Sequence, residues 1–174
     1  MLRTREIRKM TNNDILARLR YLFNYSDQKV VDICQLTGVE VLEEQIAQWL
    51  KKEDDPDFQV LSDKELATFL DGLIIEKRGR KDGPLPVPED YLTNNVILRK
   101  LKIALNLKSE DILALFASID KKLSKPELSS FFRHPDHSSY RPLMDQYLRN
   151  FLTALQLKSK NEKGRSDALG ILSS

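Results

Sequence analysis

The sequence has one cysteine, Cys34, and it contains no long apolar run. A single thiol cannot form an internal disulfide, so the fold has to be stable without cross-links, as is usual in a reducing compartment. No segment approaches the roughly 20 apolar residues that a membrane-spanning helix requires. No apolar stretch follows the basic N-terminus, as it would in a secretory signal. We therefore expect a cytoplasmic protein that does not enter a membrane.

Sequence patterns typical of catalytic sites are also missing. The chain has no Gly-rich phosphate loop, no nucleophile elbow and no His-Glu-x-x-His motif. Cys34 falls on the apolar face of a predicted helix, which favours a core position over a nucleophile. Carboxylates from separate helices can still converge without leaving a motif. The sequence indicates a binding protein without a cofactor more strongly than an enzyme.

An internal repeat is the strongest pattern that the sequence contains. Residues 11–77 align with residues 93–159 at a constant offset of 82, without a gap. The aligned pairs include Thr11 with Thr93, Asn12 with Asn94, Asn13 with Asn95, Leu19 with Leu101, Asp54 with Asp136, and Phe69 with Phe151. Because unrelated helices would not keep register across loops, the alignment indicates a duplication.

Helical spacing of apolar residues predicts the secondary structure of each copy. In copy one a first helix carries Ile15, Leu16 and Leu19, and further helices are predicted over about 27–36, 42–53 and 63–77. No segment alternates apolar and polar residues next to hairpin turn chemistry, which argues against strands. The sequence predicts an all-α protein with two tandem homologous helical lobes of about four helices each.

Composition predicts how the lobes are joined and where the chain ends. Residues 78–92 contain two glycines and three prolines, which is typical of an extended linker. Residues 1–10 are interpreted as an N-terminal extension, with Met10 as an alternative start of the chain. Residues 160–174 are polar and are predicted to form a flexible tail.

The two copies carry opposite charge. Residues 11–77 contain 7 basic and 14 acidic residues, whereas residues 93–159 contain 11 basic and 6 acidic residues. Opposed charge favours packing of one copy against the other, or self-association, within a screening length of about 8–10 Å at physiological salt.

Several segments in order resemble one known family. TNNDILARLRY, WLKKEDDPDF, FLDGLIIEKRG and NNVILRKLKIALNLK, followed by MDQYLRNFL, are similar to the YehS-like family of small bacterial proteins. The resemblance covers about residues 10–155 and implies a bacterial cytoplasmic protein with two tandem copies of a domain of unknown function. It supplies no activity and no functional residue.

Polar residues shared by the two copies are candidates for a paired binding site. Most lie at predicted helix ends, where capping explains them. The Asn-Asn pair exceeds what one cap needs, so Asn12, Asn13, Asn94 and Asn95 are the candidate twofold-related site. A groove between the lobes would suit a peptide, an amphipathic helix or a second copy of the chain.

Two alternative functions depend on residues that occur in copy two alone. Lys121, Lys122, Lys125 and Arg133 flank a predicted helix that could serve a helix-turn-helix-like, nucleic-acid-binding regulator, although the turn is long for that motif. His134, Asp136 and His137 have the chemistry of zinc ligands, and a metal-dependent enzyme is the weakest hypothesis, because copy one has no histidine in the matching loop. No resident metal is predicted.

Overall fold

The computed structural model describes residues 10–172, and all regular structure within that range is α-helical. Copy one forms α1 (Asn12–Phe23), α2 (Asp27–Gln35), α3 (Glu43–Trp49) and α4 (Asp63–Arg78). Copy two forms α5 (Asn94–Ala104), α6 (Ser109–Ser118), α7 (Lys125–Phe131) and α8 (Asp145–Leu172). The predicted all-α fold with two lobes of about four helices each is confirmed.

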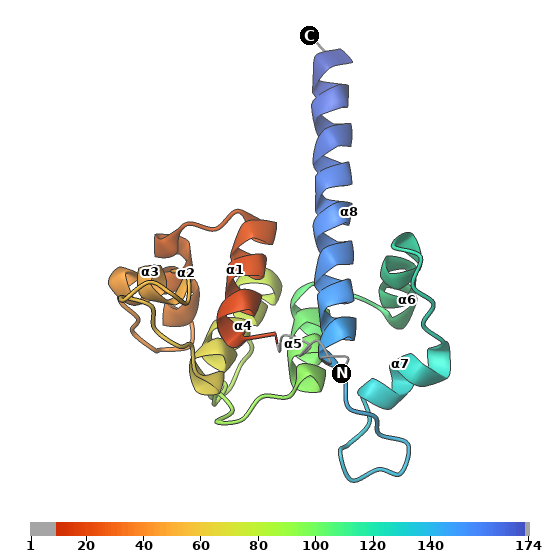
Figure 1. Cartoon of the computed structure of the whole chain (residues 1–174), viewed down its shortest axis with the longest axis horizontal. Coiled ribbons are helices and arrows are strands. Elements are labelled where there is room, and N and C mark those ends of the chain that lie inside the picture. Colours follow the sequence, from red (N-terminus) through yellow and green to blue (C-terminus); the bar gives the residue numbers. More distant parts are fainter. Residues whose placement is uncertain (1–9, 173–174) are drawn as a thin grey trace, which may run out of the picture.

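Helices from both copies share the centre of the molecule. α4 packs against α5 and α1 packs against α8, while α2 with α3 and α6 with α7 lie on opposite outer sides (Figure 1). With the offset of 82 residues, α4 is equivalent to α8 and α1 is equivalent to α5. The α4–α5 contact and the α8–α1 contact are therefore equivalent. A tandem translation cannot produce both contacts, so an approximate twofold axis relates the copies.

The core contains Ile15, Leu16 and Leu19, which the apolar spacing predicts for the first helix. Leu19 and Leu101, which are equivalent, are fully buried, and so are Leu66 and Leu148. Phe69 on α4 and Phe151 on α8 belong to the same buried cluster. The equivalent positions therefore bury the same kind of side chain in both lobes.

Helix ends use the shared polar residues as the sequence predicts. The Thr11 hydroxyl accepts a hydrogen bond from the Asp14 N–H at 3.1 Å, and the Thr93 hydroxyl accepts one from the Val96 N–H at 3.2 Å. Asn24 and Asn106 follow the first helix of each copy in the left-handed conformation, with φ of 54° and 52°. Asparagine tolerates this conformation better than most residues.

α3 is shorter than the predicted helix over 42–53, because its last carbonyls bond to the returning loop. The Asn13 Nδ2 donates to the Trp49 carbonyl at 2.9 Å, and the Gln59 N–H donates to the Gln48 carbonyl at 3.2 Å. These bonds take the acceptors that further helical turns would need. The prediction for the end of this helix is therefore wrong.

α8 also differs from the sequence-based prediction. It continues to Leu172 and extends beyond the other helices, whereas a flexible tail is predicted for residues 160–174 (Figure 1). Residues 160–172 contain no proline, and seven of the thirteen are Lys, Glu, Arg, Ala or Leu, which have high helix propensity, against two glycines. The predicted N-terminal extension falls almost wholly on residues 1–9, outside the described part.

The lobes are joined by two equivalent contacts with different chemistry. Lys100 Nζ on α5 lies 2.5 Å from Asp71 Oδ1 on α4, and both side chains are nearly buried. Their equivalents are Arg18 on α1 and Thr153 on α8, which share a hydrogen bond of 2.9 Å. Burial raises the pKa of the Asp71 carboxyl, and the hydrogen bond from Lys100 opposes that shift. An ion pair and a hydrogen bond from a guanidinium to a hydroxyl group thus occupy twofold-related places.

Candidate functional site: a groove between the lobes

Asn13 and Asn95 fix the loops that return from the third helix of each copy. The Asn13 Nδ2 donates to the carbonyls of Trp49 and Gln59, and its Oδ1 accepts from the Leu61 N–H at 3.0 Å. Asn95 forms the same three bonds with the residues at positions 131, 141 and 143. Both side chains are buried, so their carboxamides hold backbone groups that would otherwise lack partners.

Asn12 and Asn94 each bind a different aspartate, and each aspartate also connects the two copies. The Asn12 Nδ2 donates to Asp63 Oδ1 at 2.7 Å, and Asp63 Oδ2 accepts from the Leu92 N–H at 2.9 Å. Asn94 donates to Asp145 Oδ1 at 2.7 Å. Asp145 Oδ2 in turn accepts from the Met10 N–H at 3.1 Å. Each aspartate therefore ties its own copy to the segment that precedes the other copy.

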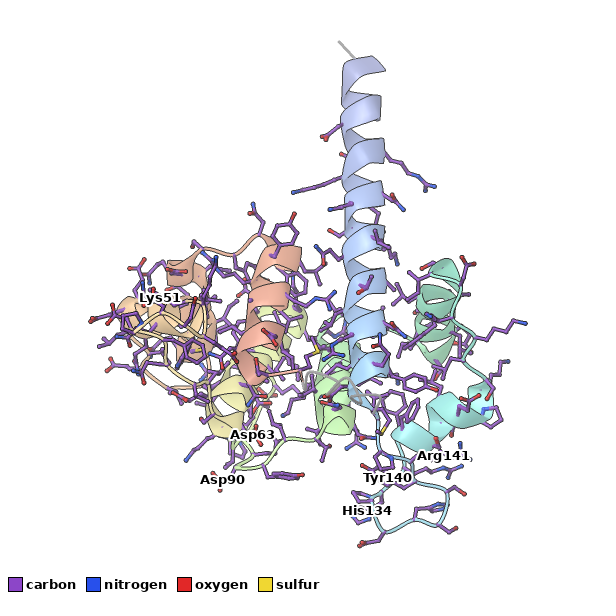
Figure 2. The ribbon with its side chains drawn as sticks, viewed as in Figure 1. Lys51, Asp63, Asp90, His134, Tyr140 and Arg141 are labelled. Atoms are coloured by element: carbon purple, nitrogen blue, oxygen red, sulfur yellow. The ribbon has the colours of Figure 1, made fainter. Side chains whose placement is uncertain are left out.

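These two clusters meet along a groove between the lobes, with a volume of about 480 Å³. Its lining consists largely of twofold-related pairs: Met10 with Leu92, Thr11 with Thr93, Asn12 with Asn94, Asn13 with Asn95, Ile15 with Ile97, Phe58 with Tyr140, Val60 with Pro142, Leu61 with Leu143, and Asp63 with Asp145. Figure 2 shows Asp63 at the start of α4, on the side of the molecule where the linker passes. The groove thus follows the approximate twofold axis.

The groove combines exposed apolar side chains with acidic groups. Val60 and Tyr91 are 75% and 76% exposed. Its described lining includes the carboxylates of Glu53, Asp63 and Asp145 and contains no lysine or arginine. The Oδ1 atoms of Asn12 and Asn94 accept no hydrogen bond from the described residues, which adds acceptors. The groove therefore offers apolar contact and hydrogen-bond acceptors, but no cation.

The structure brings the four predicted asparagines together, as a twofold-related site requires, and their binding role stays a prediction. Sequence reasoning missed the apolar part of the groove. Val60 lies in the loop before α4 and Tyr91 in the linker, so neither has a helical pattern to mark it. The signal that the sequence does offer is an apolar residue in a loop, where the helical pattern assigns it no place in the core.

Comparison with known proteins places the chain in a family. Two segments, residues 12–79 and 94–160, match the family described as a protein of unknown function, DUF1456. The chain belongs to this family. It is also 43% identical over 156 residues to the uncharacterized protein YehS of Escherichia coli (strain K12), a match that covers 89% of this chain and 100% of the relative. No solved structure matches.

In this DUF1456 protein, the three lysines and the arginine on which the nucleic-acid-binding hypothesis depends lie around α7, but at two separate places. Lys121 and Lys122 line a shallow cavity with Leu113 on α6. Lys125 begins α7, and Arg133 lines a different cavity beyond its end. The structure therefore does not gather the four into one cavity, and nucleic-acid binding stays a prediction.

The histidine loop is exposed and bonded to its own backbone. His134 Nδ1 accepts from the Asp136 N–H at 3.2 Å, and His137 Nδ1 accepts from the Ser139 N–H at 3.0 Å. Within residues 10–172, no three His, Cys, Asp or Glu side chains converge as metal ligands. Cys34 is buried, and burial raises its pKa to about 12, which suits the predicted core position.

The sequence predicts that no helix spans a membrane. Within the described part of the chain, no helix combines the length and the apolar content needed for a bilayer crossing.

Proposed function

We propose that this DUF1456 protein is a non-enzymatic, cytoplasmic binding protein whose inter-lobe groove receives an extended segment of a partner protein. The segment carries apolar side chains next to lysine or arginine. The observation that carries this proposal is the lining of the groove, which pairs exposed apolar residues with carboxylates and carboxamide oxygens.

The apolar residues support a binding role for the groove. Large exposed apolar side chains that gather at a concave surface are typical of interaction sites. Val60 and Tyr91 come from different segments and meet at the same groove, with more than 70% of each exposed to solvent. A partner that covers both would gain about 25 cal/mol for each Å² of apolar surface removed from water.

The polar residues support a cationic partner. Asp63 and Asp145 accept hydrogen bonds from neutral donors only, so their negative charges have no compensating cation in the described lining. Charge complementarity of this kind guides association and selects against acidic partners. An extended segment also supplies backbone N–H groups to the oxygens of Asn12 and Asn94.

The proposal can be tested with labelled peptides in a fluorescence anisotropy assay. The probe is an unstructured peptide in which leucine and lysine alternate, and a matched peptide has glutamate in place of lysine. We expect saturable binding of the lysine peptide alone. Val60→Ser should weaken binding about fivefold, since it removes roughly 1 kcal/mol of apolar contact.

The matched control is Val87→Ser, the same change at a valine that is 85% exposed and does not line the groove. Its affinity should equal that of the unaltered chain. Equal weakening by both variants would refute the groove as the site. Sedimentation in which Val60→Ser alone abolishes a dimer would instead assign the groove to a second copy of the chain.

A further inference from the structure

A second cavity lies in copy two, between α7 and the loop that returns to α8. It has a volume of about 440 Å³, and the side chains of Arg133, Ser129, Ser138, Ser139 and Arg141 line it together with Tyr140. Figure 2 shows Tyr140 and Arg141 together below α7, with His134 on the same loop. The residues that line the cavity thus include two arginines and several side chains with hydroxyl groups.

Both arginines keep their guanidinium groups available. Neither side chain forms an ion pair or hydrogen bond with another residue of the described part. The backbone of Arg141 is nevertheless fixed, because its N–H donates to the Ser130 carbonyl at 3.2 Å and its carbonyl accepts from Asn95. Guanidinium groups donate in a planar fork that matches the oxygens of phosphate.

The one carboxylate of the cavity is already partly engaged. Glu127 Oε1 lies 2.9 Å from the Ser124 hydroxyl, at the start of α7. Two guanidinium groups against one carboxylate leave the cavity with a net positive charge. Ser130 is not available as a donor, since its hydroxyl donates to the Glu127 carbonyl. The remaining hydroxyl donors of the cavity are Ser129, Ser138, Ser139 and Tyr140.

Copy one shows which of these residues the fold needs. The equivalent loop makes the same backbone bonds, from the Gln59 N–H to the Gln48 carbonyl and from Asn13 to the Gln59 carbonyl. The cavity residues are nevertheless replaced: Arg133 by Lys51, Arg141 by Gln59, Ser129 by Ala47, Ser138 by Pro56, Ser139 by Asp57, and Tyr140 by Phe58. Since the loop keeps its bonds without them, the fold does not explain the arginines and hydroxyls.

We infer that the cavity of copy two binds the phosphate group of a phosphate monoester. A monoester fits better than the phosphodiester backbone of a nucleic acid for two reasons. The cavity is a single concave site, and Lys121 and Lys122 line a different one. A monoester also presents three free oxygens and nearly two negative charges to the two arginines.

The test uses the full chain, labelled with ¹⁵N and titrated with phenyl phosphate at constant ionic strength while backbone and arginine signals are followed. Saturable shifts at residues 138–141 are expected. Arg133→Gln and Arg141→Gln should each raise the dissociation constant about tenfold, because each removes charge-assisted hydrogen bonds. Affinity should rise between about pH 5 and pH 7, as the second phosphate ionisation, with a pKa of about 6, completes.

Lys51→Gln is the matched control, because it removes a cation from the equivalent position of copy one, on the far side of the molecule (Figure 2). It should leave the dissociation constant unchanged. The absence of shifts at tens of millimolar phenyl phosphate would overturn the inference, as would equal weakening by Lys51→Gln. Equal affinity for dimethyl phosphate, or preferred binding of a short oligonucleotide, would overturn it in favour of a phosphodiester.

This inference is independent of the proposed function. Tyr140 lines both cavities, but neither arginine lines the inter-lobe groove. The arginine variants should therefore keep full affinity for the leucine-lysine peptide.

Discussion

Gly72 on α4 is the position where one added methyl group should disturb the fold most. A Cβ atom at this residue would lie 2.1 Å from the Ile33 carbonyl oxygen and 2.8 Å from the carbonyl carbon on α2. Real Cβ atoms essentially never approach other heavy atoms within 3.0 Å. The obstructing atoms belong to the backbone, so a side-chain rotation cannot relieve the contact. Gly72→Ala therefore requires α2 and α4 to move apart.

The magnitude follows from two opposing effects. Overpacking of a well-packed core costs about 1–3 kcal/mol, and we take the upper end because the obstacle is backbone. Alanine is favoured over glycine inside a helix by about 1 kcal/mol. We expect Gly72→Ala to lower the free energy of unfolding by about 2 kcal/mol. The equivalent residue of copy two is Ala154, which is buried, so the second lobe already accommodates this methyl group.

Urea unfolding followed by far-UV circular dichroism measures the effect, with linear extrapolation to water. Gly164→Ala is the matched control, since Gly164 is also helical, on α8, and a Cβ atom there would meet nothing within 4 Å. This control should gain up to about 1 kcal/mol from helix propensity alone. If Gly72→Ala gained stability as Gly164→Ala does, the close approach of α2 and α4 would be refuted.

Three further predictions use the same unfolding assay or a thiol assay. Lys100→Met should cost about 3–5 kcal/mol, because it leaves the Asp71 carboxylate buried without its cation. Burial raises the pKa of Asp71, so the folded state binds the proton more tightly than the unfolded state does. The stability of this variant should therefore fall as pH rises through that pKa, and the absence of a pH dependence would contradict the burial of this carboxyl. Asn95→Ala should cost about 2–3 kcal/mol, because it leaves the Leu143 N–H and two carbonyls without their partner, and a loss below half of that would contradict the role of the carboxamide. Cys34 has a pKa of about 12, so at neutral pH it should react with an aromatic disulfide reagent only as fast as the chain unfolds. Rapid reaction in the absence of urea would contradict this and show that the thiol is accessible.

The fold could be predicted from local patterns because the helices are amphipathic and the duplication doubles the signal. The spacing of Leu19, Leu66 and their equivalents follows the helical period, and each of these residues is buried. Thr11 and Thr93 cap their helices through contacts only three residues away. Such interactions depend on neighbouring residues, so a sequence reveals them directly.

The contacts by which each copy binds the segment that precedes the other copy could not be predicted, because they join residues that are far apart in the sequence. Asp63 meets the Leu92 N–H across 29 residues, and Asp145 meets the Met10 N–H across 135 residues. No local pattern distinguishes these aspartates from ordinary residues near helix ends. The early end of α3 has the same origin, since Asn13 reaches the Trp49 carbonyl from 36 residues away.

Equivalent positions in the two copies separate what the fold requires from what it leaves open. Asn13 and Asn95 hold their loops with the same three hydrogen bonds, so the loop conformation does not depend on the side chains at its tip. Arg141 and Gln59 occupy the same backbone place, yet a guanidinium and a neutral amide offer different chemistry to solvent. A loop that keeps its conformation while its surface residues vary can acquire a ligand without a cost to folding. The duplication thus supplies two scaffolds of the same shape, and the anion site that we infer uses only one of them.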